Sequence, residues 1–265
     1  MIREPAVAGR FYQSSGEVLR REVEGYLSYD GEKKMYTGCV VPHAGYMFSG
    51  ETAGMVLSRI DIPDTVILLS PNHTGAGKSI SVWSGGGWRT PLGTVDIDEK
   101  IRESIYSIDG AEPDTEAHTM EHSIEVIIPF LQVMNEDVAI VPVTAACRDL
   151  ERLVSFGRST AETVSASGKD ILLVASSDMT HMEPAEQAKT KDMKCIEKMK
   201  QVDPDGLYSL VTGEGISMCG VFPVTILLAA CRHMGAAEGK LVNYTNSGET
   251  TGDRMNVVGY AGMLF

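Results

Sequence analysis

Residues 66–75 read VILLSPNHTG, an apolar run that turns through proline and asparagine into His73 and a glycine. Residues 39–46, CVVPHAGY, repeat the pattern, with His43 after the apolar run. Short Val, Ile and Leu runs bounded by Pro, Asn and Gly predict buried strands of a parallel sheet, and open α/β sheets bind ligands at the carboxyl ends of such strands. Two imidazoles there favour a metal site, although a single histidine at a strand end is more often a hydrogen-bonded structural residue.

Strands and helices alternate along the whole chain, and parallel strands joined by helical crossovers need helices on both faces of the sheet. We therefore predict one three-layer α/β/α domain over residues 1–265 with a mostly parallel central sheet, since no repeat or long linker divides the chain. The expected strands are Gly38–Val41, Thr65–Ser70, Ser79–Trp83, Val138–Val143, Ile171–Ser176, Lys240–Thr245 and Asn256–Leu264. The expected helices are Ser15–Leu27, Ser49–Arg59, Asp98–Ser107, Thr119–Met134, Asp149–Ser165, Pro184–Met199, Pro204–Val211 and Val221–Met234, with a hairpin or loop at Gly85–Gly93.

The composition is that of a globular domain with an acidic balance. Of the 265 residues, 43% are hydrophobic and 22% are charged, and the formal net charge is -13. Nucleic acids and anionic membranes are bound by basic surfaces, so this charge argues against both as main partners.

No part of the sequence predicts export or a disulfide framework. Residues 1–12 carry charges and a proline where a signal peptide needs an apolar core. The longest apolar stretch, Val221–Cys231, is about half the length of a membrane span. Five cysteines, an odd number without C-x-x-C spacing, fit neither paired disulfides nor a zinc ribbon. We therefore expect a protein of the reducing cytoplasm.

A third apolar strand, Ile171–Ser176, leads into Asp178 and His181. Together with His43 and His73, these residues predict a polar cluster at one edge of the sheet. Asp178 has an ordinary structural alternative, because an aspartate here would also be suited to capping a following helix.

The segment AHTMEHSIEV, residues 117–126, adds His118, His122 and Glu125. On a helix, positions three apart share a face, so His122 and Glu125 are expected to point the same way. Thr119 is placed to cap this helix, which would leave His118 outside it. The H-E-x-x-H motif of zinc helices is absent. We therefore expect an amphipathic helix with one functional imidazole.

Cys219 differs from the other cysteines, which lie within apolar patterns typical of packing residues. It precedes Gly220, and Pro223 marks the first turn of an apolar helix. A thiol just before a helix N-terminus has its thiolate favoured by the helix dipole. Cys219 is therefore a candidate nucleophile or metal ligand.

These segments also carry a family resemblance that runs in order from one end of the chain to the other. The matching stretches are REPAVAGRFY (Arg3–Tyr12), PHAGYMFSG (Pro42–Gly50), LLSPNHTG (Leu68–Gly75), RTPLGTVDID (Arg89–Asp98), EHSIEVIIPF (Glu121–Phe130), ASSDMTH (Ala175–His181) and CGVFP (Cys219–Pro223). In them the chain resembles the Memo family, whose archaeal and bacterial members are called AmmeMemoRadiSam system protein B. Such an ordered set is far more specific than any single motif.

The resemblance implies an α/β fold related to class III extradiol dioxygenases, which are non-haem iron enzymes that cleave catechol-type rings. In those enzymes two histidines and a carboxylate bind Fe(II) and leave positions open for substrate and dioxygen. His43 and His73 match the histidine ligands, and Cys219 stands where the dioxygenases have a glutamate. The resemblance thus implies Fe(II), while a thiolate moves the preference toward copper or zinc.

The same resemblance places His181 and Asp178 in the pocket, with His122 as a further polar partner. In this interpretation His181 is the general base and Asp178 orients it. The family name implies association with a radical-SAM protein and an Ammecr-type protein. Animal members are described as binding phosphotyrosine peptides and as acting in copper- or iron-linked redox signalling.

Three functions remain open from the sequence. The first is a metal-dependent oxidoreductase with iron or copper bound by His43, His73 and Cys219. The second is a binding module, in which a degenerate dioxygenase pocket captures a phosphorylated or carboxylated small molecule or peptide, or a partner protein, without turnover. The third is a cysteine hydrolase that uses Cys219 with His181.

Overall fold

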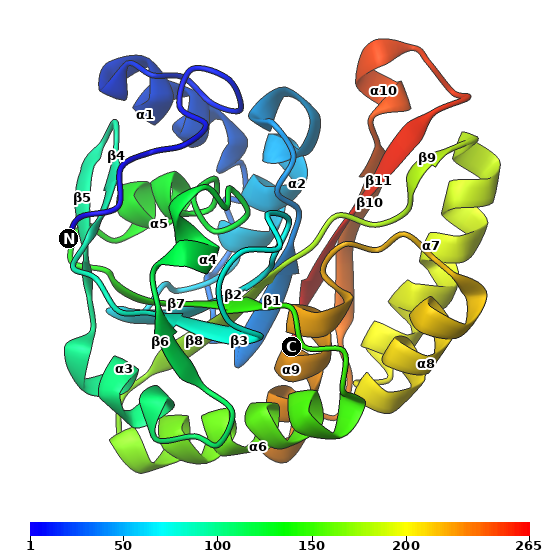
Figure 1. The fold of residues 1–265 in the computed structure, drawn as a ribbon. Coiled ribbons are helices and arrows are strands. Elements are labelled where there is room, and N and C mark those ends of the chain that lie inside the picture. Colours follow the sequence, from blue (N-terminus) through cyan, green and yellow to red (C-terminus); the bar gives the residue numbers. More distant parts are fainter.

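The computed structural model describes all 265 residues, which form a large central sheet between layers of helices (Figure 1). The strands are β1 Gly38–Val41, β2 Thr65–Pro71, β3 Ile80–Trp83, β4 Trp88–Thr90, β5 Gly93–Ile97, β6 Glu112–Asp114, β7 Ala139–Ala145, β8 Ile171–Ser176, β9 His181–Glu183, β10 Lys240–Asn246 and β11 Val257–Leu264. The helices are α1 Gly16–Tyr26, α2 Tyr46–Leu57, α3 Glu99–Tyr106, α4 Glu116–Thr119, α5 Ile128–Met134, α6 Leu150–Ser167, α7 Ala185–Lys200, α8 Pro204–Glu214, α9 Val221–His233 and α10 Gly248–Thr251.

The centre of the sheet is parallel and its flanks are partly antiparallel. The strand order is β10-β11-β1-β8-β2-β7-β3-β6. Strands β1, β8, β2 and β7 run parallel to one another, whereas β11 is antiparallel to β1 and β3 is antiparallel to β7. The predicted α/β/α fold with a mostly parallel sheet is confirmed.

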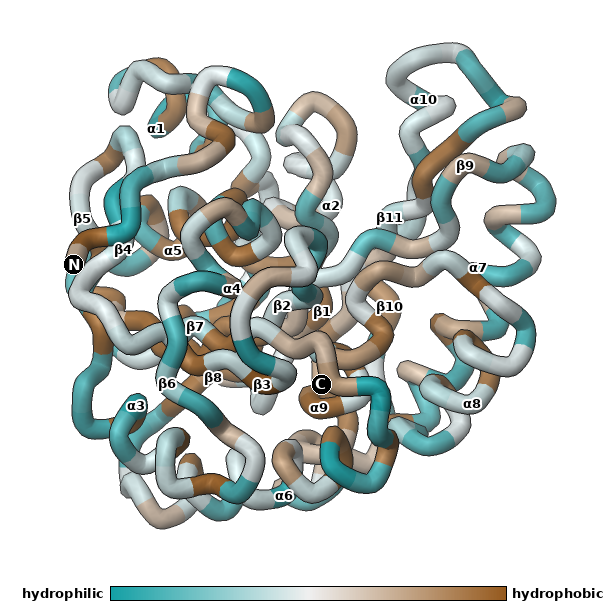
Figure 2. The backbone as a smooth tube through the Cα atoms, in the orientation of Figure 1, coloured by the Kyte–Doolittle hydropathy of each residue, from teal (hydrophilic) through white to brown (hydrophobic).

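Helices cover both faces of the sheet, which explains why its central strands are apolar on both sides. Successive residues of β2 alternate between two cores. Val66 and Leu68 belong to the core that includes α1, α2 and α5, whereas Ile67 and Leu69 belong to the core that includes α6, α8 and α9. Figure 2 shows hydrophobic residues gathered in these inner strands and in α9.

The expected helix over Thr119–Met134 is wrong. The short helix α4 ends at Thr119, and α5 begins only at Ile128, with turns and irregular backbone between them. Thr119 therefore ends a helix instead of capping one, and His118 lies inside α4. Elsewhere every expected strand and helix is present, and β4 pairs with β5 in the expected hairpin.

Two buried carboxylates explain why the helix is interrupted. A continuous helix would place Glu121 and Glu125 on one face, because positions four apart are neighbours there. In the fold Glu121 accepts hydrogen bonds from His73, while Glu125 accepts from Arg3 in the N-terminal segment. These tertiary contacts override the local helical pattern, since a buried carboxylate must be matched by donors.

A buried ion pair fixes the N-terminal segment to the turns between α4 and α5. Arg3 Nη1 donates to Glu125 Oε2 at 2.7 Å, and the two side chains are only 1% and 0% exposed. The hydroxyl of Tyr12 and two backbone N–H groups of the same segment also donate to this carboxylate. The stretch between Arg3 and Tyr12 is thereby held against the turns between α4 and α5.

All five cysteines are free thiols, and four of them are buried. None of the helices is both long enough and apolar enough to cross a membrane.

Replacing Arg3 by alanine leaves the Glu125 carboxylate buried without its cation, so we predict a loss of about 3–5 kcal/mol in the free energy of unfolding. Urea unfolding at neutral pH measures this loss. The matched control is Arg89→Ala, which removes an exposed pair with Glu4 at 3.2 Å and should cost less than about 1 kcal/mol. Similar small losses in both variants would contradict the anchoring role.

Candidate metal centre

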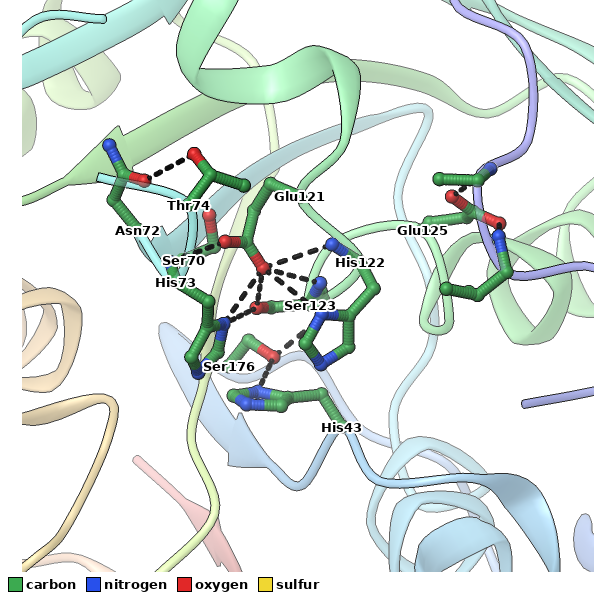
Figure 3. A network of polar contacts seen from close by, with 12 residues as sticks. His43, Ser70, Asn72, His73, Thr74, Glu121, His122, Ser123, Glu125 and Ser176 are labelled. Atoms are coloured by element: carbon green, nitrogen blue, oxygen red, sulfur yellow. Dashed lines mark hydrogen bonds and ion pairs between the residues drawn. The ribbon is translucent and has the colours of Figure 1, made fainter. Parts of the chain in front are cut away.

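Three polar residues follow neighbouring parallel strands at equal distances along the chain. His43, Asp178 and His73 each come two residues after the ends of β1, β8 and β2. Because these strands are adjacent and parallel, their carboxyl ends lie at one edge of the sheet. His122, from the turns before α5, reaches the same place (Figure 3).

The imidazoles of His43, His73 and His122 form one group that could hold a metal ion. Each offers a ring nitrogen, and the three nitrogens lie within 4.8 Å of one another. The ring centroids are 5.2 Å apart for His43 and His73, 5.4 Å for His43 and His122, and 4.9 Å for His73 and His122. Imidazole nitrogens are common ligands of zinc, copper and iron. The family resemblance implied His122 as a further polar partner in the pocket, and the structure brings it beside the two predicted ligands.

Hydrogen bonds fix the orientation of the His43 and His73 rings. Ser176 Oγ donates to the backbone carbonyl of Ser123 at 3.0 Å, so its oxygen is left to accept from His43 Nδ1 at 2.6 Å. His73 Nδ1 lies 3.0 Å from Glu121 Oε1 and donates to it. In both rings Nδ1 is engaged, which leaves Nε2 as the nitrogen that could bind a metal.

Cys219 lies against His43 at the start of α9. Its Sγ is 3.2 Å from His43 Nε2, and it accepts the backbone N–H of Asp178, also at 3.2 Å. The next residue, Gly220, packs on the end of β8 so closely that a Cβ would lie 2.3 Å from the Cβ of Ser177. The absence of a side chain at Gly220 therefore lets α9 bring the thiol to the edge of the sheet.

The expected depression of the Cys219 pKa is wrong. Burial, reinforced by the nearby charge of Asp178, raises the pKa of this thiol well above its usual range. Desolvation of the thiolate outweighs the helix dipole, because the thiol is packed between α9 and β8. The side chain is therefore a neutral thiol unless a cation binds to it.

Burial also sets the charge state of the histidines. Desolvation lowers the pKa of His43 and of His122, and neighbouring imidazoles lower the His43 pKa further. The pKa of His73 is raised, because its contact with Glu121 outweighs desolvation. Burial opposes ionisation of Glu121, but the hydrogen bond from His73 leads a set of donors that lowers its pKa to about 2. His43 and His122 are thus neutral at pH 7, as metal ligation requires.

Asp178 and His181 lie at the pocket without the expected contact between them. Asp178 Oδ1 accepts the backbone N–H of His43 at 2.8 Å, and burial raises the pKa of this carboxyl to about 6. His181 Nδ1 is 2.9 Å from the backbone carbonyl of Ser217, which orients the ring in place of Asp178. Asp178 caps no helix either, since β9 follows it and α7 begins at Ala185.

A pocket of about 410 Å³ opens beside the histidine group. Part of its wall comes from the anchored N-terminal segment, which supplies Arg10 and Phe11, and the Phe11 ring lies 4.9 Å from that of His122. Phe48 of α2 and Tyr260 of β11 add aromatic surface. The full lining is Arg10, Phe11, His43, Ala44, Gly45, Phe48, His73, His122, Asp178, His181 and Tyr260.

His118 and Glu125 lie outside the site, although they neighbour His122 in the sequence. The His118 ring is fully buried beside Trp83 and Trp88, and it contacts Ser81 and Thr144. Burial lowers the pKa of His118 to about 4. Glu125 points away toward the N-terminal segment (Figure 3). The expected shared face of His122 and Glu125 is therefore wrong.

Four residues of the site were not predicted from the sequence: Glu121, Ser176, Arg10 and Phe11. Nothing in the spacing of Glu121 or Ser176 indicates a partner far along the chain. For Arg10 and Phe11 a signal existed, because the stretch AGRFY combines a glycine turn, a cation and two aromatic rings near the N-terminus.

Comparisons with known proteins agree with the motifs. A family model described as "Memo-like protein" matches residues 3–264. A "MEMO1 family protein" of Aquifex aeolicus is 43% identical over 266 residues, covering 100% of this chain and 99% of its own. A MEMO1 family protein of Methanopyrus kandleri is 40% identical, with 100% and 99% covered. The crystal structure of the uncharacterized protein JW3007 from Escherichia coli K12 matches with a TM-score of 0.55 over 86% of this chain and 98% of that chain, at 12% identity, which shows a likeness of fold.

The buried His118 should make stability depend on pH. Its pKa is about 4 in the fold against 6.5 for a free side chain, so the unfolded chain binds more protons in this window. Stability is then lost as pH falls from 6.5 to 4, by up to about 3 kcal/mol from this group. We predict that His118→Gln flattens this part of the curve of unfolding free energy against pH, measured by urea unfolding. The exposed His233→Gln serves as control, and identical slopes in both variants would refute the assignment.

Proposed function

The chain belongs to the Memo family, and on that premise we propose that it is a metal-dependent oxidoreductase whose metal is bound by His43, His73, His122 and Cys219. The observation that carries the proposal is the convergence of three imidazole nitrogens within 4.8 Å at one edge of the sheet. The Cys219 sulfur, 3.2 Å from His43 Nε2, adds a fourth donor. In this proposal His122 is a ligand and not an acid–base group.

The spacing of the three imidazole nitrogens is close to what a metal requires. Metal–nitrogen distances of about 2.0–2.2 Å put two ligands of a tetrahedral ion about 3.5 Å apart. A spread of at most 4.8 Å thus needs a contraction of at most about 1.3 Å. His73 is the most exposed of the three and lies in the loop after β2.

The donor set favours a redox-active or borderline-soft metal. We propose Fe(II) on the family resemblance to dioxygenases, with copper or zinc as alternatives, because a thiolate is softer than the glutamate of those enzymes. Binding must displace the proton of Cys219, so affinity should rise with pH. Such a metal would supply Lewis acidity or electron transfer toward a substrate and dioxygen.

The surrounding side chains have roles of their own in this proposal. His181 Nδ1 is held by the Ser217 carbonyl, so Nε2 is available to take or give a proton at the pocket. Asp178 is a positioning residue that holds the backbone of His43. Phe11 and Phe48 line the pocket and exclude water from one side of the reacting group.

The cysteine hydrolase is the weakest of the three functions. It requires a thiolate–imidazolium pair. Burial raises the pKa of Cys219 and lowers that of its partner His43, so both effects favour the neutral pair. The contact of the thiol is also with His43, whereas His181 is bound to Ser217.

A binding module without turnover is the second candidate, and one observation favours it. Arg10 lines the pocket beside Phe11 and Phe48, and its guanidinium has no carboxylate partner. A cation next to aromatic rings fits an anionic group on an apolar body. Such a site would capture a phosphorylated or carboxylated ligand.

Metal affinity tests the main proposal. We predict that anaerobically purified protein binds Fe(II), Cu(I) or Zn(II), and that His43→Ala and Cys219→Ala each lower the affinity by well over tenfold, because each removes a donor. Elemental analysis and titration against a competing chelator measure this. Cys195→Ala and Cys231→Ala are the controls, since both thiols are buried in the core away from the site. Equal losses in all cysteine variants would indicate unfolding. Oxygen consumption with a panel of catechols separates turnover from binding alone.

Ligand binding to metal-free protein tests the second candidate. If the protein is a binding module, we predict that it binds benzoate or phenyl phosphate. Arg10→Gln should weaken this binding by at least about tenfold, because it removes one charge-assisted contact. Calorimetric titration measures it. Arg89→Gln is the matched control, because Arg89 is exposed and pairs with Glu4 outside the pocket. No binding in the wild type, or equal binding in both variants, would exclude Arg10 recognition.

A further inference from the structure

We propose that Glu121 is a positioning residue that fixes the tautomer of His73 and joins His73 and His122 into one rigid unit. The inference rests on the proposed metal function, because its purpose is to present ligand nitrogens. Glu121 itself does not face the pocket. It lies behind the two imidazoles, as Figure 3 shows, with dashed contacts radiating from its carboxylate to both.

Both oxygens of the carboxylate are used by these two histidines and by Ser123. Oε2 accepts the backbone N–H of His73 at 2.6 Å. Oε1 accepts from His73 Nδ1 and from the backbone N–H groups of His122 and Ser123, each at 3.0 Å, and from the Ser123 hydroxyl. The side chain is 1% exposed, so no water competes for these donors.

This arrangement dictates the protonation of the His73 ring. An ionised carboxylate only accepts hydrogen bonds, so Nδ1 of His73 must carry the proton. In a neutral imidazole Nε2 is then the unprotonated nitrogen. Free imidazole side chains favour the opposite tautomer, and Glu121 therefore holds His73 in a form that is prepared for ligation.

The absence of a fixed cation distinguishes Glu121 from an ordinary structural carboxylate. Glu125, four residues on, is neutralised by Arg3, whereas the carboxylate of Glu121 has only His73 and His122 within ion-pair distance. Arg3 donates to the backbone carbonyl of Glu121 and not to its side chain. A buried carboxylate is costly without a compensating charge. A cation bound by the two histidines would supply that charge one residue away, the pattern of carboxylate–histidine–metal sites.

Glu121 also couples two segments that are distant in the sequence. The loop after β2 carries His73, and the turns between α4 and α5 carry His122. Because one carboxylate binds the backbone of both, the spacing between these two ligands is set before any metal arrives. The neighbouring ligand His43 is oriented by the neutral hydroxyl of Ser176 instead.

Nitrogen NMR of the histidine rings tests the proposal directly. In metal-free protein at alkaline pH, we expect His73 in the Nδ1–H form in the wild type and a shift toward the Nε2–H form in Glu121→Gln. The matched control is Ser176→Ala, which should alter the His43 signals and leave His73 unchanged. Glu121→Asp keeps the charge on a shorter side chain and should restore part of the Nδ1–H population.

Metal titration provides the second measurement. With Zn(II) as probe and a competing chelator, Glu121→Gln should lower affinity by about 10–100-fold, the usual effect of removing a carboxylate behind a metal-bound histidine. A wild-type His73 in the Nε2–H form, or a tautomer unchanged in Glu121→Gln, would overturn the proposal, and the wild-type spectrum decides even if the variant does not fold. A tautomer shift without metal binding in the wild type would support positioning by Glu121 and refute the metal function.

Discussion

Two carboxylates buried four residues apart, Glu121 and Glu125, constrain everything around the turns between α4 and α5. An ionised carboxylate accepts hydrogen bonds and donates none, so each of the two must be surrounded by hydrogen-bond donors from other segments. Glu125 binds the N-terminal segment through Arg3, and Glu121 binds the loop that carries His73. The same stretch of backbone therefore locates a wall of the pocket on one side and the histidine group on the other.

The fold was predictable because strands that are buried on both faces are recognisable in the sequence. Strands such as β2 are apolar at consecutive positions, since alternate residues enter different cores. The region 119–134 was not predictable in the same way. Its apolar spacing fits a helix, and the hydrogen bonds that interrupt it come from Arg3 and His73, which no local pattern contains.

The site residues likewise fall into those that the sequence predicts and those that it does not. His43, His73 and Asp178 each follow a parallel strand, so topology alone brings them to one edge of the sheet. The hydrogen-bond partners that orient the imidazole rings were not predictable from topology. Ser176 and the Ser217 carbonyl act through contacts at 2.6 and 2.9 Å, and the ionisation of Cys219 depends on how deeply α9 packs against β8. These are properties of packing, and spacing in the sequence does not encode them.

The charge of the site differs from the net charge of the whole chain. The net charge of -13 attracts cations in general, whereas the carboxylates hydrogen-bonded to His43 and His73 are those of Asp178 and Glu121. Burial favours the protonated form of Asp178 and a neutral His43, His122 and Cys219, which leaves Glu121 as the one carboxylate whose pKa is lowered there. A cation bound by the imidazoles would lie one residue from that charge. Metal binding and folding would then be linked, because an ion bound by the histidines would also stabilise the Glu121 carboxylate that positions them.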